Sequence, residues 1–128
     1  MRQLLLDAHV ALWALSSPSG LSPKARALIE DPHNTVAVWA VSVWEVAIKQ
    51  AAGKLSAPTG FAAECREAGF DPLAITFEHA TAAGALPMHH ADPSDRMLIA
   101  QAIDERLELV SEDRVFAEYE GIRLVAQT

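Results

Sequence analysis

The stretch His89-His-Ala-Asp-Pro-Ser-Asp-Arg-Met-Leu-Ile-Ala-Gln-Ala-Ile103 places two acids at the start of an otherwise apolar segment. Asp92 followed by Pro93 is a strong helix start, because Asp caps free N–H groups and proline fits the first helical position. The apolar residues that follow predict a helix buried over much of its surface. Asp95 then falls in the first turn, where the helix dipole alone favours an acid. A chemical role for Asp95 therefore depends on which other acids lie beside it.

Composition and charge narrow the class of protein. The chain has 128 residues, of which 51% are hydrophobic, and a formal net charge of −7. We expect one compact domain, residues 1–128. This negative charge disfavours binding to nucleic acid or an anionic membrane over a broad surface. A cluster of acids that binds a cation would also make the net charge negative. Without a membrane-spanning run or a signal-peptide pattern, we expect a cytoplasmic protein. Cys65 is the only cysteine, which excludes an internal disulfide and a zinc site built on cysteine pairs.

Short apolar runs that end in acids predict the strands of a sheet. Leu4–Leu6 is followed directly by Asp7, and Leu107–Ser111 is followed by Glu112 and Asp113. Continuous apolar runs of this length are typical of strands that are buried on both faces. Two shorter strand candidates are Leu73–Thr76 and a final edge strand at Ile122–Ala126.

A further run, Thr35–Val41, is rich in β-branched residues and predicts a second buried strand. Ser42-Val-Trp-Glu45 follows it and begins a helix that ends near Gly53. Glu45 is then in the first turn. Ser-x-x-Glu is also the capping-box pattern, so local reasoning alone makes Glu45 a helix cap.

Helices are predicted between these strands. Their ranges are 10–15, 22–31, 57–68 with Gly69 as C-cap, 77–85, the central segment, and a turn at 115–119. Strands alternating with helices predict a three-layer α/β domain, with a mostly parallel sheet of about five strands flanked by helices. Ligands of such sheets bind beyond the carboxyl ends of the strands.

Acids from separate segments are expected at that edge. They are Asp7, Glu45, Asp92, Asp95 and Asp113. Local capping accounts for Glu45 and Asp95 taken singly, but not for Asp7 or Asp113. Carboxylates brought together repel one another unless a cation neutralises them, and oxygen ligands suit Mg²⁺ or Mn²⁺. One or two such ions would supply the chemistry of phosphodiester hydrolysis.

Four motifs together carry a family resemblance. They are Leu4-Leu-Leu-Asp-Ala-His-Val-Ala-Leu-Trp13, Val41-Ser-Val-Trp-Glu-Val-Ala-Ile-Lys49, His90-Ala-Asp-Pro-Ser-Asp-Arg-Met-Leu-Ile-Ala-Gln101 and Leu109-Val-Ser-Glu-Asp113. In this order and spacing the whole chain resembles a PIN domain, and more narrowly the VapC toxins of bacterial type II toxin–antitoxin systems. The resemblance implies a Mg²⁺- or Mn²⁺-dependent endoribonuclease that cuts RNA, often as a homodimer, and that a VapB-type antitoxin restrains.

The resemblance also implies roles for particular acids. Asp7, Glu45, Asp95 and Asp113 match the catalytic, metal-binding acids of the family, with Asp113 acting directly or through water. Asp92 matches a further acid of the His-x-Asp-Pro-x-Asp-Arg subgroup. The chain departs from the family at Ala8 where Thr is frequent, at Ser94 where Phe is usual, and in ending the late strand Ser-Glu-Asp where Thr-x-Asp is commoner. None of these departures removes an acid.

Candidate substrate contacts lie next to the acids. They are His9, Arg96, Arg114 and Ser111. For Arg96 and Arg114, salt bridges to the neighbouring acids are an equal alternative. Lys49 follows Glu45 at the i, i+4 spacing that favours an ion pair.

Aromatic and histidine side chains are less informative. His89 and His90 fit a loop or helix-start role better than a metal pair. Trp13, Trp39 and Trp44 fit core or dimer packing better than base stacking.

Other classes of protein are disfavoured. A phospho-acceptor signalling domain needs an Asp ending a central strand and a Lys ending a later one, and neither Leu73–Thr76 nor Ile122–Ala126 supplies them. A phosphatase of the haloacid-dehalogenase type needs Asp two residues after Asp7, where this chain has His9. The alternative left open is a catalytically silent PIN-like protein-binding module.

Overall fold

The sheet has five strands, all parallel, in the order β3-β2-β1-β4-β5. The computed structural model describes residues 1–54, 60–87 and 92–126. The strands are β1 (Gln3–Leu6), β2 (Thr35–Trp39), β3 (Asp71–Leu73), β4 (Glu108–Ser111) and β5 (Arg123–Ala126). The predicted parallel sheet of about five strands is confirmed, and β5 lies at an edge of it as expected.

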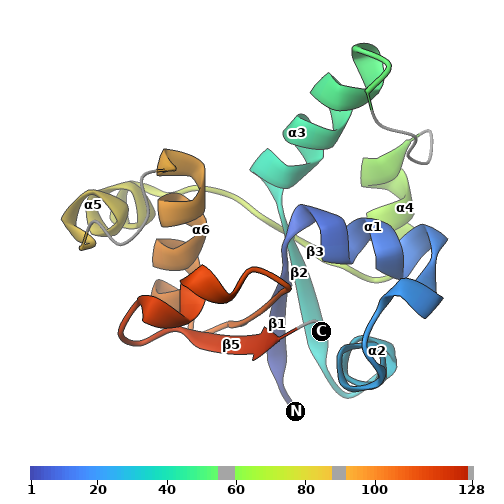
Figure 1. Ribbon diagram of the computed structural model, residues 1–128, viewed down its shortest axis with the longest axis horizontal. Helices are drawn as coiled ribbons and strands as arrows, with labels where there is room; N and C mark the ends of the chain where they lie inside the picture. Colours follow the sequence, from blue (N-terminus) through green and yellow to red (C-terminus); the bar gives the residue numbers. More distant parts are fainter. Residues whose placement is uncertain (55–59, 88–91, 127–128) are drawn as a thin grey trace.

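Helices cover both faces of the sheet, which makes three layers (Figure 1). The helices are α1 (Ala8–Ser16), α2 (Pro23–Glu30), α3 (Ala40–Ala51), α4 (Phe61–Glu67), α5 (Phe77–Ala85) and α6 (Pro93–Asp104), with short 3₁₀ turns η1 (Pro18–Gly20) and η2 (Arg114–Glu118). One core packs α1, α2 and α4 against the sheet, together with Val46 of α3. The other core packs α6 and η2 against the opposite face, and α5 lies beside α6.

Strand β1 is the centre of the fold. Leu4, Leu5 and Leu6 are each 0% exposed. Leu4 and Leu6 belong to one core and Leu5 to the other, as the alternation of side chains along a strand requires. Because β1 pairs with β2 on one side and β4 on the other, the residues after all three strands meet at one edge.

Two element boundaries differ from prediction in ways that matter. Strand β2 ends at Trp39 and α3 begins at Ala40, so Ser42 lies inside the helix and Glu45 lies beyond the first turn. The capping-box interpretation of Glu45 is therefore wrong. Strand β3 occupies Asp71–Leu73 and not Leu73–Thr76. It contains Pro72, which an edge strand tolerates because its outer N–H positions need no partner.

Other boundaries follow the sequence closely. Helix α5 has the predicted range, and α6 begins at Pro93 with Asp92 as its N-cap. Gly69 follows the end of α4 at a φ of +84°, the left-handed conformation that glycine adopts most easily. The predicted start of that helix, at 57–59, lies outside the described residues.

Candidate metal centre

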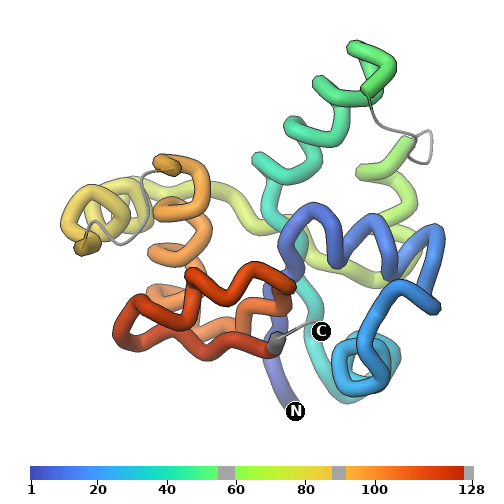
Figure 2. Tube along the Cα trace, in the orientation of Figure 1, coloured from blue at the N-terminus to red at the C-terminus, as the bar shows by residue number. Residues whose placement is uncertain are grey.

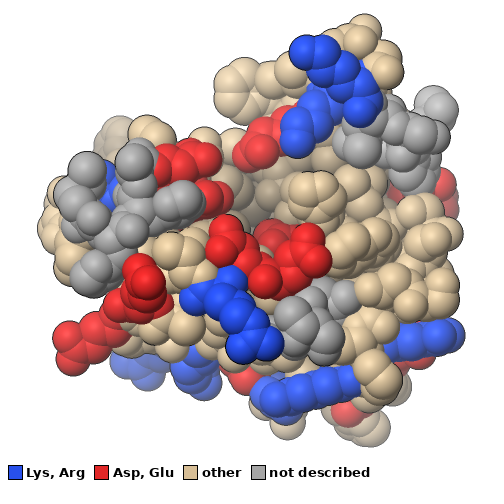
Figure 3. All heavy atoms as spheres, in the orientation of Figure 1, with Lys and Arg blue, Asp and Glu red and all other residues tan. Residues whose placement is uncertain are grey.

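A pocket of about 270 Å³ opens at the carboxyl edge of the sheet. Five acids line it, contributed by the β1–α1 junction, α3, α6 and the segment after β4: Asp7, Glu45, Asp95, Glu112 and Asp113. Figure 3 shows Asp and Glu side chains gathered around a hollow in the middle of one face. The four acids that the sequence marked as catalytic therefore line one pocket.

Asp7 is held in place at the start of α1. Its backbone follows β1 directly, and its Oδ1 accepts the Val10 N–H at 3.0 Å as the N-cap of the helix. Burial raises the pKa of Asp7, and the nearby charge of Glu112 adds to the rise, while hydrogen bonds from Ser111 and Val10 oppose it. The carboxylate is thus fixed in an environment where its negative charge is costly.

Ser111 connects two strand ends. It is 0% exposed at the end of β4. Its Oγ accepts the Asp113 N–H at 3.1 Å, and its hydroxyl hydrogen-bonds with the Asp7 side chain. A hydroxyl has one proton to donate, so Ser111 donates to Asp7 and accepts from Asp113. Its buried place makes it a support for two acids, whereas the sequence had suggested a substrate contact.

Glu45 enters the pocket from α3, on the same helix face as Ser42 and Lys49. Burial raises the pKa of Glu45, and the charges of Asp95 and Asp92 raise it further, against the opposing charge of Lys49. Asp92 does not line the pocket, yet its charge reaches Glu45. Acids from α3 and α6 therefore repel one another across the pocket.

Capping falls on different acids than expected. Asp7, Asp92 and Asp113 are the N-caps of α1, α6 and η2, each with one side-chain oxygen accepting a backbone N–H. The interpretation that capping could not explain Asp7 and Asp113 is therefore wrong. A cap uses one carboxylate oxygen, which leaves lone pairs for another ligand. Asp95 lies in the first turn of α6, as predicted.

Comparison with known proteins decides the family. The PIN-domain family model matches residues 4–122. Ribonuclease VapC22 of Mycobacterium tuberculosis is 36% identical over 122 residues, covering 89% of each chain. The chain belongs to the PIN-domain family. Its similarity to ribonuclease VapC22 places this PIN domain with the VapC-type members.

Solved structures share the fold at lower identity. VapBC2 from Rickettsia felis, bound to a DNA fragment from its promoter, matches with a TM-score of 0.71 and 13% identity, over 98% of this chain and 99% of that one. DNA-bound VapBC from Salmonella typhimurium matches with a TM-score of 0.68 and 17% identity, over 98% of each chain. At these identities the likeness establishes the fold of the PIN domain.

The donor set of the pocket fits a hard divalent cation. It consists of carboxylates, and the pKa values of Asp7 and Glu45 are raised. The acids of α3 and α6 also repel one another. Within the described ranges, no three of the pocket acids have oxygens within 4.8 Å of one another. Mg²⁺ is commonly held by one or two carboxylates and keeps several waters. Residues spaced in this way suit one or two direct ligands, with the other acids acting through water.

A tighter group of possible ligands lies elsewhere in the PIN domain. Among the described residues, His79, Asp104 and Glu105 have ligand atoms within 4.8 Å of one another, at the opposite end of α6 from Asp95. His79 Nδ1 accepts the Thr76 N–H and the Gln101 amide, each at 3.1 Å. Its proton is therefore on Nε2, which lies 2.8 Å from Glu105 Oε2. An Nε2 that carries a proton has no lone pair for a metal, so this group is a hydrogen-bonded link between helices.

The proposed substrate contacts are placed differently. His9 is exposed and lines the acidic pocket. Arg96 does not line it: its Nη2 donates to the carbonyls of Leu86 at 2.9 Å and Ala83 at 3.3 Å, at the end of α5. Among the described residues Arg96 forms no ion pair with an acid, and its role as a substrate contact stays a prediction. Arg114 is exposed at the start of η2, outside the lining. His89 and His90 lie outside the described residues.

Two charged residues of the lining were not marked as functional by the sequence. Glu112 lies in the pocket next to Asp113, and the acid pair after β4 was the signal that could have indicated it. Lys49 also lines the pocket, although an ion pair with Glu45 was expected. The described part of the chain contains no ion pair of Lys49 with any acid.

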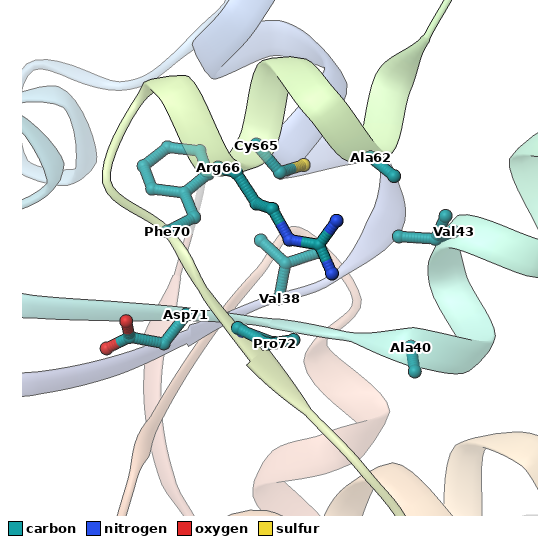
Figure 4. Close-up of a pocket in the computed structure, with 9 residues that line it drawn as sticks. All are labelled: Val38, Ala40, Val43, Ala62, Cys65, Arg66, Phe70, Asp71 and Pro72. Carbon is teal, nitrogen blue, oxygen red and sulfur yellow. The ribbon is translucent and has the colours of Figure 1, made fainter.

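A second pocket, of about 160 Å³, lies on the other side of α3 and is mainly apolar. Figure 4 shows Cys65 and Phe70 lining it, the Arg66 guanidinium extending across it and the Asp71 carboxylate pointing away. Burial raises the pKa of the Cys65 thiol to about 11, so the thiol is not a nucleophile near neutral pH. This pocket therefore lacks the chemistry of the first.

The expectation that the chain does not cross a membrane has one structural check. None of the helices in the described ranges is both long and apolar enough to span a bilayer.

Proposed function

We propose that this PIN domain is a metal-dependent endoribonuclease toxin that hydrolyses RNA phosphodiester bonds. The observation that carries the proposal is the meeting of Asp7, Glu45, Asp95 and Asp113, from four separate segments, in one pocket. The 36% identity with ribonuclease VapC22 supports RNA as the substrate. A non-catalytic binding module would have no need for this repulsion between carboxylates.

Each residue has a task in this proposal. Asp7, Glu45 and Asp95 would bind Mg²⁺ or Mn²⁺, one or two of them directly and the rest through water, and Asp113 and Asp92 would act through water. A bound divalent ion neutralises charge on the phosphate and lowers the pKa of a water. Ser111 fixes the orientation of Asp7 by a hydrogen bond. The N-cap bonds at Asp7 and Asp113 hold one oxygen of each carboxylate and so restrict how each side chain turns.

The test is cleavage of tRNA and rRNA fragments by the purified chain with Mg²⁺, Mn²⁺ or EDTA, beside an Asp95→Asn variant prepared identically. We expect metal-dependent cutting by the wild type alone. Equal cutting by both would reveal a contaminating nuclease. With Mn²⁺ binding confirmed by calorimetry, the absence of cutting by either would favour the catalytically silent binding module.

We also propose a VapB-type antitoxin as the partner of this chain. Structures with this fold include VapBC complexes from two bacteria. The pocket acids would accept a basic side chain of the antitoxin, which would balance their charge without a metal. Exposed apolar side chains on α3, Trp44 at 64% and Ile48 at 49%, support the expectation of a homodimer. Co-purification from the native operon tests the partner, since a chain recovered alone and tolerated by cells would contradict it.

A further inference from the structure

Lys49 lies in the acidic pocket but has no role in the proposed metal chemistry. It lines the acidic pocket and also a small hollow between α1 and α3 that adjoins it. Ala8, His9, Glu45 and Lys49 line both, so they lie where the two hollows join. Of the described residues that line either hollow, Lys49 is the only Lys or Arg.

The Lys49 ammonium group is available to a ligand. Its side chain is exposed, and in the described ranges it is engaged in no ion pair. Its charge lowers the pKa of Glu45, so it is near the acids without being bound to them. A lysine in the last turn of a helix is favoured by the helix dipole. That preference does not explain why Lys49 shares a helix face with Ser42 and Glu45, both in the pocket lining.

An RNA substrate faces an electrostatic problem at this pocket. The chain carries a net charge of −7, and five acids line the pocket. A bound divalent ion offsets part of that charge at the scissile phosphate, but the neighbouring phosphates of the strand still meet a negative surface. Figure 3 shows basic side chains over the outer part of α3, beside the acids, and another basic group just below the acids in the middle of the view. Lys49 is the basic side chain that reaches the pocket itself.

We propose that Lys49 binds an RNA phosphate adjacent to the scissile one, at the rim of the acidic pocket where it meets the small hollow between α1 and α3. This inference rests on the proposed ribonuclease function and names the residue that positions its substrate. His9, on the α1 side of the same hollow, is the neighbouring polar group. The ligand class is a phosphodiester of single-stranded RNA.

The experiment measures RNA binding apart from cleavage. A fluorescent single-stranded RNA fragment is titrated with Asp95→Asn protein, alone or combined with Lys49→Ala, Lys49→Arg or Lys24→Ala, at several salt concentrations. Lys24→Ala removes the same charge from an exposed position on α2, where it acts on Glu108 and not on the pocket acids. We expect Lys49→Ala to weaken binding about tenfold and to reduce the salt slope by about 0.7, the value for one phosphate contact. Lys49→Arg and Lys24→Ala should leave both quantities close to those of the parent.

A second readout separates the proposed role from a purely electrostatic one. In the active background, Lys49→Ala should raise KM far more than it lowers kcat, since a flanking contact is made equally in ground and transition states. Equal effects of Lys49→Ala and Lys24→Ala would overturn the inference. So would an unchanged salt slope with tighter Mn²⁺ binding, because Lys49 would then be a counter-ion of the acids. Wild-type cleavage with no effect of Lys49 overturns this inference alone, whereas a wild type that cuts no RNA overturns the proposed function as well.

Discussion

The two ends of helix α6 carry acids in opposite situations. At its start, Asp95 faces a pocket of carboxylates whose charges raise the pKa of Glu45. At its end, Asp104 and Glu105 share the Nε2 proton of a buried histidine, His79. The acids at the end of α6 are closer together, but their hydrogen bonds are already made. A cation would therefore be favoured at the start of α6. What distinguishes the start is unbalanced negative charge, and not a short distance between carboxylates.

The strongest test of this comparison replaces Glu45, which shares the pocket with Asp95 at the start of α6, and Glu105 at the end of α6. We expect Glu45→Gln to lower the single-turnover rate of RNA cleavage about 100- to 1000-fold, because a catalytic metal supplies several kcal/mol and each 1.4 kcal/mol is tenfold in rate. Glu105→Gln should change the rate less than about twofold, within the range of ordinary surface substitutions. The rates are measured on the same RNA fragment in Mg²⁺. Similar losses in the two variants would show that the distinction between the ends is wrong.

The second test addresses stability at the end of α6. His79→Ala should lower the free energy of unfolding by about 3 kcal/mol, since it removes a helix-capping bond, opens a cavity at a buried side chain and takes one partner from the buried Gln101 amide. Urea unfolding measures the change, and Mn²⁺ affinity should remain as in the wild type. The control is His33→Ala, at an exposed histidine that bonds Asp31 on the surface, which should be nearly silent. A loss of Mn²⁺ affinity in the His79 variant would make this group a metal site after all.

The third test adds a metal ion. At a Mn²⁺ concentration about 100 times its Kd, binding to the folded chain should add about 2.7 kcal/mol to the free energy of unfolding. Thermal unfolding with and without EDTA should therefore differ by several degrees. The shift should disappear in Glu45→Gln and persist in Glu105→Gln. Persistence in both variants would place the metal outside the acidic pocket.

The smallest expected effect is a pH-dependent gain in the stability of Asp7→Asn, measured without metal. Because the pKa of Asp7 is raised above 3.8 in the folded chain, its contribution to stability is complete below pH 3.8. This contribution is lost as the pH rises through the raised pKa. Asparagine keeps an oxygen for the Val10 N–H and carries no charge. The variant should therefore be more stable than the wild type by an amount on the order of 1 kcal/mol near neutral pH, with little difference near pH 4. Urea unfolding in EDTA at the two pH values measures it, and a less stable variant near neutral pH would contradict the sign.

Much of the fold is readable from the sequence because local signals agree with the topology. Leu4–Leu6 is apolar throughout and is buried on both faces, and Asp92-Pro93 starts α6 as its local chemistry predicts. Strand β3 was misplaced by two residues because Asp71-Pro72 has the composition of a turn. Only its position at the sheet edge makes proline acceptable there. The start of α3 was misplaced because Ser-x-x-Glu is a capping signal even inside a helix.

The candidate site was predictable where topology alone determines it. Acids that follow parallel strands must meet at one edge, so Asp7 and Asp113 were found without any knowledge of side-chain direction. The environment of His79 was not predictable, because its partners Asp104 and Glu105 lie about 25 residues away along the chain. The direction of Arg96 was equally hidden, since nothing local indicates that its guanidinium caps the end of α5.

The central place of β1 also has a consequence for hydrogen exchange. Its backbone is bonded on both sides within the buried sheet, so its amides should exchange only when the whole chain unfolds. Helix α3 extends outward from the carboxyl edge of the sheet, as the chain trace in Figure 2 shows. Its Trp44 and Ile48 side chains are exposed. Its amides should exchange through smaller openings that leave the sheet intact. One wall of the pocket, at Asp7, would thus be rigid, and the other, at Glu45 and Lys49, would adjust its distance to the strand of RNA.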